Sequence, residues 1–154
     1  MVRMTDLHHD DRASLTGKHL PRFDPPAWAP APPIAQSRIA LVTTAGLHVR
    51  GDRVFDMTSV EYRAIDRDTA GGDIVMSHTS VNFDRSGFAE DVNVVFPIDR
   101  FRELEASGAI GSMADVHYSF MGAYLEPGAY APSARELATL LRGDGVDSVF
   151  LTPV

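Results

Sequence analysis

Three histidines outside the N-terminal segment lie where a parallel sheet gathers functional groups. His48 and His78 each come shortly after an apolar, strand-like run, and His117 lies within or near the end of another. The C-terminal tips of parallel strands meet at one edge of an open sheet, so we expect these imidazoles to converge there. Imidazole can bind a metal, transfer protons near neutral pH or hold an anion.

A polar loop containing Asp84, Asp91 and Asn93 follows His78 and adds carboxylates to this predicted edge. The pattern is compatible with a divalent metal site, with a site for a polar substrate or partner, and with three independent histidines that make ordinary hydrogen bonds. The histidine spacings of 30 and 39 residues match no compact metal motif. We therefore assign no metal ligand.

Small residues follow two of the predicted strands. Thr43, Thr44, Ala45 and Gly46 stand where a phosphate-binding turn would lie, but the chain contains no G-x-G-x-x-G or G-x-x-x-x-G-K-[ST] motif. A tight turn that needs a flexible glycine explains this segment better than a nucleotide site does. Gly122 after Met121 is interpreted in the same way, as packing and a turn.

Composition narrows the possible functions further. The chain has 154 residues, 44% of them hydrophobic, a formal charge of −7 and no cysteine. This length suits one domain, and the missing thiols exclude a disulfide framework and a cysteine nucleophile within these residues. The acidic balance argues against nucleic-acid binding. No apolar run reaches membrane-spanning length and the first residues are polar, so we expect a cytoplasmic protein.

The chain divides into a polar, Pro-rich N-terminal arm over 1–37 and an α/β domain over 38–154. Six of the ten prolines fall between Pro21 and Pro33, around Trp28, which predicts an extended arm. The predicted strands span 38–44, 62–65, 73–77, 113–120 and 146–151, and the predicted helices lie within 96–108 and 132–142. Mostly apolar strands that alternate with helices predict an open, mostly parallel sheet with helices on both faces, a three-layer Rossmann or flavodoxin-like arrangement.

Several segments taken together resemble one family, the selenoprotein B proteins of the glycine, sarcosine, betaine and D-proline reductases. The segments that carry the resemblance are Ile39–His48, Tyr62–Arg63, Val75–His78, Asp91–Asp99, Gly108–Gly111, His117–Gly122 and Gly145–Val154. They occur in order from about residue 25 to the end of the chain. The specificity of the match comes from their order and spacing, since no single segment is decisive.

The resemblance implies an oxidoreductase subunit that takes part in reductive cleavage of a C–N bond in amino acid or betaine-type substrates, with a dithiol/disulfide acceptor. It implies a selenocysteine, with a cysteine nearby, in a loop after the strand corresponding to Val146–Leu151. It also implies an oligomeric complex with a pyruvoyl-bearing subunit and thiol-donor proteins as partners. The selenolate would be the nucleophile, ionised at neutral pH as an activated thiolate is.

The chain departs from this pattern because it ends at Val154, about where the family places its selenocysteine. We therefore expect that the α/β domain is incomplete at its C-terminus, because UGA, the codon for selenocysteine, is also a stop codon and was read as one. These residues then contain no catalytic nucleophile or cofactor of their own. The edge that faces the selenium loop is expected to contain Thr44, Gly46, His48, His78, His117 and Gly122. The alternative is a non-catalytic α/β binding or assembly module. A small hydrolase is disfavoured, because no nucleophile–base pair is visible.

Overall fold

The computed structural model describes residues 3–17, 29–81, 84–123 and 126–154. Trp28 and the prolines between Pro21 and Pro26 lie outside these residues, so the extended arm stays a prediction. Within 3–17 the chain forms a short helix, α1 (His9–Thr16), after a 3-10 turn at Met4–Asp6. The sequence analysis did not anticipate α1, because the segment is polar on all sides.

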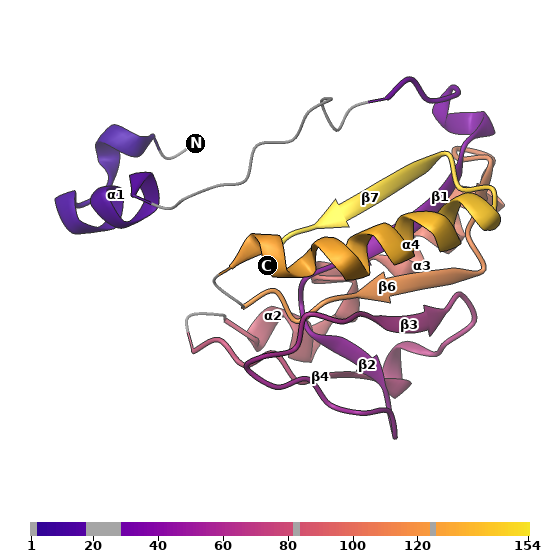
Figure 1. Ribbon diagram of the computed structural model, residues 1–154. Helices are drawn as coiled ribbons and strands as arrows, with labels where there is room; N and C mark the ends of the chain where they lie inside the picture. Colours follow the sequence, from indigo (N-terminus) through magenta and orange to yellow (C-terminus); the bar gives the residue numbers. More distant parts are fainter. Residues whose placement is uncertain (1–2, 18–28, 82–83, 124–125) are drawn as a thin grey trace.

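The main sheet is mixed and has β1 (Arg38–Thr43) at its centre (Figure 1). β1 pairs in parallel with β7 (Ser148–Thr152) on one edge, and with β5 (Ser112–Met113) and β6 (Val116–Ser119) in succession. β3 (Arg63–Asp66) pairs with β6 in the antiparallel sense. The expected α/β sheet is thus confirmed in its general form, with one antiparallel strand.

A separate two-stranded sheet corrects the predicted position of the segment 73–77. β4 (Ile74–Met76) does not join the main sheet; it pairs in the antiparallel sense with β2 (Leu47–Val49), which the sequence analysis missed. The chain curls away from β1 through a turn at Gly46, where φ is +66°. Strands of three residues are too short to show an alternating pattern in the sequence. β2 and β4 are recognisable as strands only because they pair with each other.

The predicted strand 113–120 is divided in the structure, because β5 ends at Met113 and β6 begins at Val116. Ala114 and Asp115 separate β5 from β6, although Ala114 N–H still donates to the Ile39 carbonyl at 2.9 Å. The main-chain ladder between β1 and its neighbour is therefore discontinuous opposite Leu41. The His117 side chain supplies the missing acceptor for Leu41 N–H.

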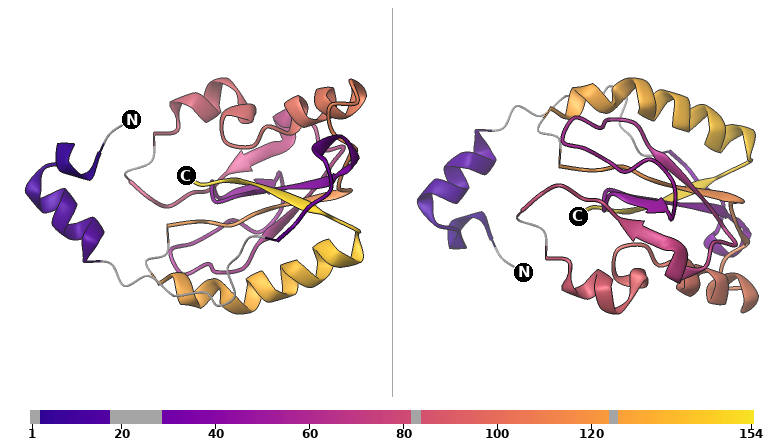
Figure 2. Two further views of the ribbon diagram at one scale, coloured as in Figure 1. Left: turned by 90° about the horizontal axis from the view of Figure 1, so that it is seen from above. Right: turned by 90° about the horizontal axis from the view of Figure 1, so that it is seen from below.

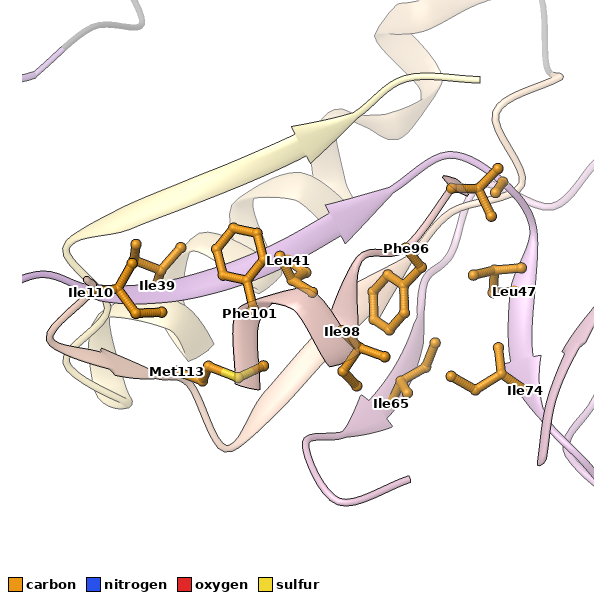
Figure 3. Close-up of a cluster of buried hydrophobic side chains, with 12 residues drawn as sticks. Ile39, Leu41, Leu47, Ile65, Ile74, Phe96, Ile98, Phe101, Ile110 and Met113 are labelled. Atoms are coloured by element: carbon orange, nitrogen blue, oxygen red, sulfur yellow. The ribbon is translucent and has the colours of Figure 1, made fainter. Parts of the chain in front are cut away.

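Helices lie on both faces of the main sheet, as Figure 2 shows. α4 (Ala131–Gly143) covers one face, and α2 (Ser86–Glu90) and α3 (Ile98–Ala106) lie on the other. α4 packs Leu137 into a small cluster with Val42, Tyr118 and Phe120. The larger cluster lies on the α3 side, where Figure 3 shows Phe101 beside Leu41 of β1, and Ile98 near Phe96 and Ile65.

The ends of α3 illustrate how the sequence sets the helix boundaries. α3 begins at Ile98 after Pro97, and the Asn93 side chain, which precedes the helix, accepts from Asp99 N–H through its Oδ1 at 3.0 Å. At the other end, Gly108 follows the C-cap Ser107 with φ +73°, the conformation that commonly ends a helix. These features orient α3 so that Phe101 is buried against the sheet.

Candidate functional site

Four strand ends meet at the C-terminal edge of the main sheet. Gly46 N–H donates to the Phe120 carbonyl at 2.8 Å, which ties the end of β1 to the end of β6. Ser77 N–H, after β4, donates to the Gly46 carbonyl at 2.9 Å, and Thr44 N–H donates to the Thr152 carbonyl of β7 at 3.1 Å. Residues far apart in the sequence therefore share one small region.

Two glycines allow these strand ends to approach closely. A Cβ on Gly46 would lie 2.9 Å from the His78 Cα, and a Cβ on Gly122 would lie 2.5 Å from the Thr44 carbonyl oxygen. Both glycines have positive φ, +66° and +75°, in the region that side-chain-bearing residues avoid. The interpretation of Gly46 as a flexible turn residue is confirmed, and Gly122 has the same role at the neighbouring strand.

A cavity of about 350 Å³ opens beside Thr44 and Gly122. Its remaining lining comes from Phe120 and from the segment that leads into α4. That segment contributes Pro127, Tyr130 and Ala134. The walls are apolar, so the cavity suits the hydrocarbon part of a small molecule or a side chain, and polar chemistry has to come from its rim. Thr44 is at that rim, and its Oγ1 accepts from Val154 N–H at 2.9 Å.

His78 is the one of the three histidines that the structure places at this edge. Its backbone packs on Gly46, its Nδ1 accepts from Ser80 N–H at 3.2 Å, and Arg85 Nη2 donates to its carbonyl at 2.6 Å. Burial lowers the pKa of His78, and the nearby Arg85 guanidinium lowers it further. Both effects favour the neutral ring, the state in which imidazole can accept a proton.

His117 lies within β6 and supports the sheet. The side chain is fully buried, and its Nδ1 accepts from Leu41 N–H at 3.1 Å, opposite the break between β5 and β6. The ring also meets Phe96 edge to face. Burial, followed by the charges of Arg67 and Arg102, lowers the pKa of His117 to about 4. Its Nε2 has no hydrogen-bond partner among the described residues.

His48 lies in β2, opposite Val75 of β4, and is also buried. Its Nδ1 lies 3.0 Å from the Val49 carbonyl oxygen, which can only accept, so this nitrogen is the donor of the hydrogen bond. The structure thus brings Thr44, Gly46, His78 and Gly122 together and leaves His48 and His117 inside strands. The role at the active-site edge that the sequence predicts for six residues stays a prediction. These residues are Thr44, Gly46, His48, His78, His117 and Gly122.

The loop carboxylates and Arg63 have structural partners. Asp84 and Asp91 accept from main-chain N–H groups two residues on, and these bonds lower the pKa of both carboxyl groups. Arg63 pairs with Glu61 at 3.1 Å and lies over the Phe55 ring. Within the described ranges, no three His, Asp or Glu side chains come together in a way that could hold a metal ion.

The sequence analysis missed the apolar half of the site. Phe120, Tyr130 and Ala134 line the cavity only because the 3-10 turn Pro127–Tyr130 places the start of α4 beside the end of β6. A proline–glycine turn before a helix at the C-terminal edge of a sheet was the available signal. In the part of the chain that the structure describes, no helix is long and apolar enough to cross a membrane.

Comparison with known proteins adds the biochemical context. Residues 10–154 match the family described as Glycine/sarcosine/betaine reductase selenoprotein B. The D-proline reductase subunit gamma of Acetoanaerobium sticklandii is 32% identical over 137 residues, which cover 87% of this chain and 56% of the relative.

Two further relatives match over a smaller share of their length. The Betaine reductase complex component B subunit beta of Peptoclostridium acidaminophilum is 29% identical over 80% of this chain and 29% of its own. The Glycine reductase complex component B subunit gamma of Carboxydothermus hydrogenoformans is 29% identical over 82% of this chain and 32% of its own length. The chain thus spans about half the length of the first relative and less than a third of the other two. No solved structure matches it.

Proposed function

Because this chain belongs to the glycine/sarcosine/betaine reductase selenoprotein B family, we propose that it is a subunit of a reductase complex that cleaves a substrate C–N bond. The observation that carries the proposal is the family match over 10–154, which includes every strand of the C-terminal edge. In the overall reaction, two electrons and two protons convert the C–N bond to C–H and N–H. A dithiol supplies them and becomes a disulfide.

The redox atom has to come from polypeptide outside these 154 residues, because they contain neither cysteine nor selenocysteine. A selenocysteine of the same gene, encoded by UGA, is the source that we propose. A reductase complex that contains this chain and is active without selenium in any subunit would remove this part of the proposal.

The C-terminal edge is the surface that we assign to the active site. The apolar cavity beside Thr44 and Gly122 would hold the hydrocarbon part of the substrate, which limits the access of water to the reacting bond. His78, which lies next to Gly46, would exchange a proton or hold the substrate carboxylate at the same C-terminal edge. His117 and His48 would act indirectly, by fixing the strands that carry the edge.

A pyruvoyl-bearing subunit and a thiol-donor protein are the partners that we propose, in an oligomeric cytoplasmic complex. Cytoplasmic thiols are kept reduced, as a dithiol donor requires. The proposed complex would contain the mixed sheet as part of a larger three-layer, Rossmann or flavodoxin-like unit.

Reconstitution tests the function directly. The other reductase subunits are assayed with and without this chain for cleavage of the C–N bond and oxidation of the dithiol, on D-proline, glycine, sarcosine and betaine. Cleavage opens the ring of D-proline, and it releases ammonia or an amine from the other three substrates. We expect product only when the chain and its selenium-bearing segment are both present. Ala134→Phe, which fills the cavity, is expected to raise the KM, and Ala129→Phe, at the preceding 3-10 turn and outside the cavity lining, serves as the matched control.

A non-catalytic assembly module is the second candidate, favoured by the absence of any thiol in the 154 residues. The Ala134→Phe variant distinguishes the two candidate functions. If the chain only assembles the complex, Ala134→Phe leaves the KM unchanged, and all substrates respond alike to removal of the chain. A substrate-dependent change in KM supports the edge as part of the active site.

A further inference from the structure

β7 is an edge strand with the character of an inner one. Among the described residues it pairs only with β1, and Figure 1 shows it at the outer limit of the sheet. Its residues, Ser148 to Thr152, include no charge and no proline. Natural edge strands are normally protected by such residues, whereas inner strands of parallel sheets are apolar on both faces.

Both faces of β7 expose apolar side chains. Phe150 contacts Phe101 of α3, with ring centroids 5.2 Å apart, yet it is 45% exposed. Val149 and Leu151 alternate with Phe150 and so lie on the opposite face, where they are 41% and 67% exposed. An ordinary edge strand would bury at least one of these faces against its own domain.

The α3 helix leaves a further apolar residue on the same side. Arg102 donates to carbonyls near β3, at Arg67 and Thr69, so the flank of α3 that carries Arg102 points away from β7. Leu104 lies on the other flank of α3, toward β7, and is also exposed. Leu104 and Phe150 thus form a surface that a second helix, packed beside α3, would cover.

The main-chain groups of β7 also point outward. Ile39 pairs with Ser148 and Thr43 with Thr152, and the Thr152 carbonyl accepts from Thr44. Alternate residues of a strand direct their N–H and C=O to opposite edges, so Val149 and Leu151 present theirs to the open side. A strand placed there would find a regular set of donors and acceptors.

We infer that β7 is an inner strand of a longer sheet, and that the occupant of its open edge is the part of the family polypeptide that the relatives possess and this chain does not match. The length supports this occupant, since the match covers 56% of the A. sticklandii subunit. That polypeptide adds a strand beside Val149 and Leu151 and a helix over Phe150 and Leu104.

A second copy of this chain fits the edge less well. The four side chains (Leu104, Val149, Phe150 and Leu151) expose on the order of 400 Å² together, so a β7–β7 pair would bury about 800 Å², below what a stable dimer needs. Each copy also has a formal charge of −7, which opposes close association. A strand followed by a helix would bury more surface than a second copy of β7.

Co-expression tests the inference. The full 154-residue chain is produced together with the unmatched portion of the A. sticklandii subunit, and the mass of the complex and the hydrogen exchange of the β7 amides are measured. We expect a one-to-one complex in which Val149 and Leu151 N–H exchange at least tenfold more slowly than in the chain alone. Leu151→Lys should lower recovery of the complex at least tenfold, because an edge lysine blocks strand addition.

Leu140→Lys is the matched control, since Leu140 is an exposed leucine on the α4 flank that faces away from β7, next to Glu136 and its partner Tyr62. Failure to form the complex, a complex without slowed exchange, or a β7–β7 dimer of the chain alone would each overturn the inference. The inference rests on family membership and not on the proposed reductase activity, so the outcomes of the two tests are independent.

Discussion

Acidification should destabilise this protein through one buried imidazole, that of His117. Burial lowers its pKa from 6.5 to about 4, with Arg67 and Arg102 contributing in the same direction. The unfolded chain binds a proton at this ring below about pH 6.5, whereas the folded protein does not until about pH 4. The stability is therefore fully present above pH 6.5 and is lost as the pH falls toward 4.

The magnitude follows from linkage. A displacement of the pKa from 6.5 to about 4 corresponds to roughly 3 kcal/mol when the loss is complete, of which about 2.5 kcal/mol is lost between pH 7.5 and pH 4.5. That is a large part of the ordinary stability of a domain of this size. His78 titrates in the same direction, since burial also lowers its pKa.

The assay is urea unfolding of the chain at pH 7.5 and 4.5. His117→Asn is the informative variant, because its Oδ1 can accept from Leu41 N–H as Nδ1 does and it does not titrate. We expect the wild type to lose about 2.5 kcal/mol more than this variant over the same interval. His117→Leu separates the hydrogen bond from the titration, since it leaves Leu41 N–H without an acceptor and costs about 1–3 kcal/mol at pH 7.5. Equal pH dependence in the wild type and His117→Asn would refute the reasoning.

Three further predictions concern the fold. Gly122→Ala should lower the free energy of unfolding by roughly 3 kcal/mol or more, whereas Gly108→Ala, with similar φ and no atom near the added Cβ, should lower it by about 1 kcal/mol. Arg38→Met should cost about 2 kcal/mol, because it leaves the half-buried Asp144 carboxylate without its ion pair, and thermal melting in low and high salt would check this. Asn93→Ala should cost about 1 kcal/mol by removing the acceptor of Asp99 N–H in the first turn of α3, and unchanged amide exchange at the start of α3 would contradict this.

The sequence was most informative where a single segment determines its own structure. The strand β1 and the helices α3 and α4 depend on local propensity or burial, and each lies close to its predicted range. The expected meeting of strand ends also follows from parallel pairing alone, and it brings Thr44 and Gly122 together.

The rest depends on contacts between distant segments. His117 looked like an edge residue because its strand seemed continuous, and only the break at Ala114 and Asp115 gives its ring the buried Leu41 N–H as a partner. β2 and β4 define each other by pairing, and neither three-residue strand has a pattern of its own. The cavity likewise needs the turn before α4; the proline–glycine pair indicates that turn, but its place beside the end of β6 depends on the packing of α4.

Purification of the native complex tests the central claim most directly. The chain is tagged at its N-terminus in its source organism, recovered without denaturation, and assayed on the resin for dithiol-dependent C–N cleavage of the four candidate substrates. We predict that the chain recovers other reductase subunits in fixed proportion, with one C–N bond cleaved for each dithiol oxidised. A chain that purifies without reductase subunits, or whose removal leaves the reductase activity of the extract unchanged, would contradict the claim.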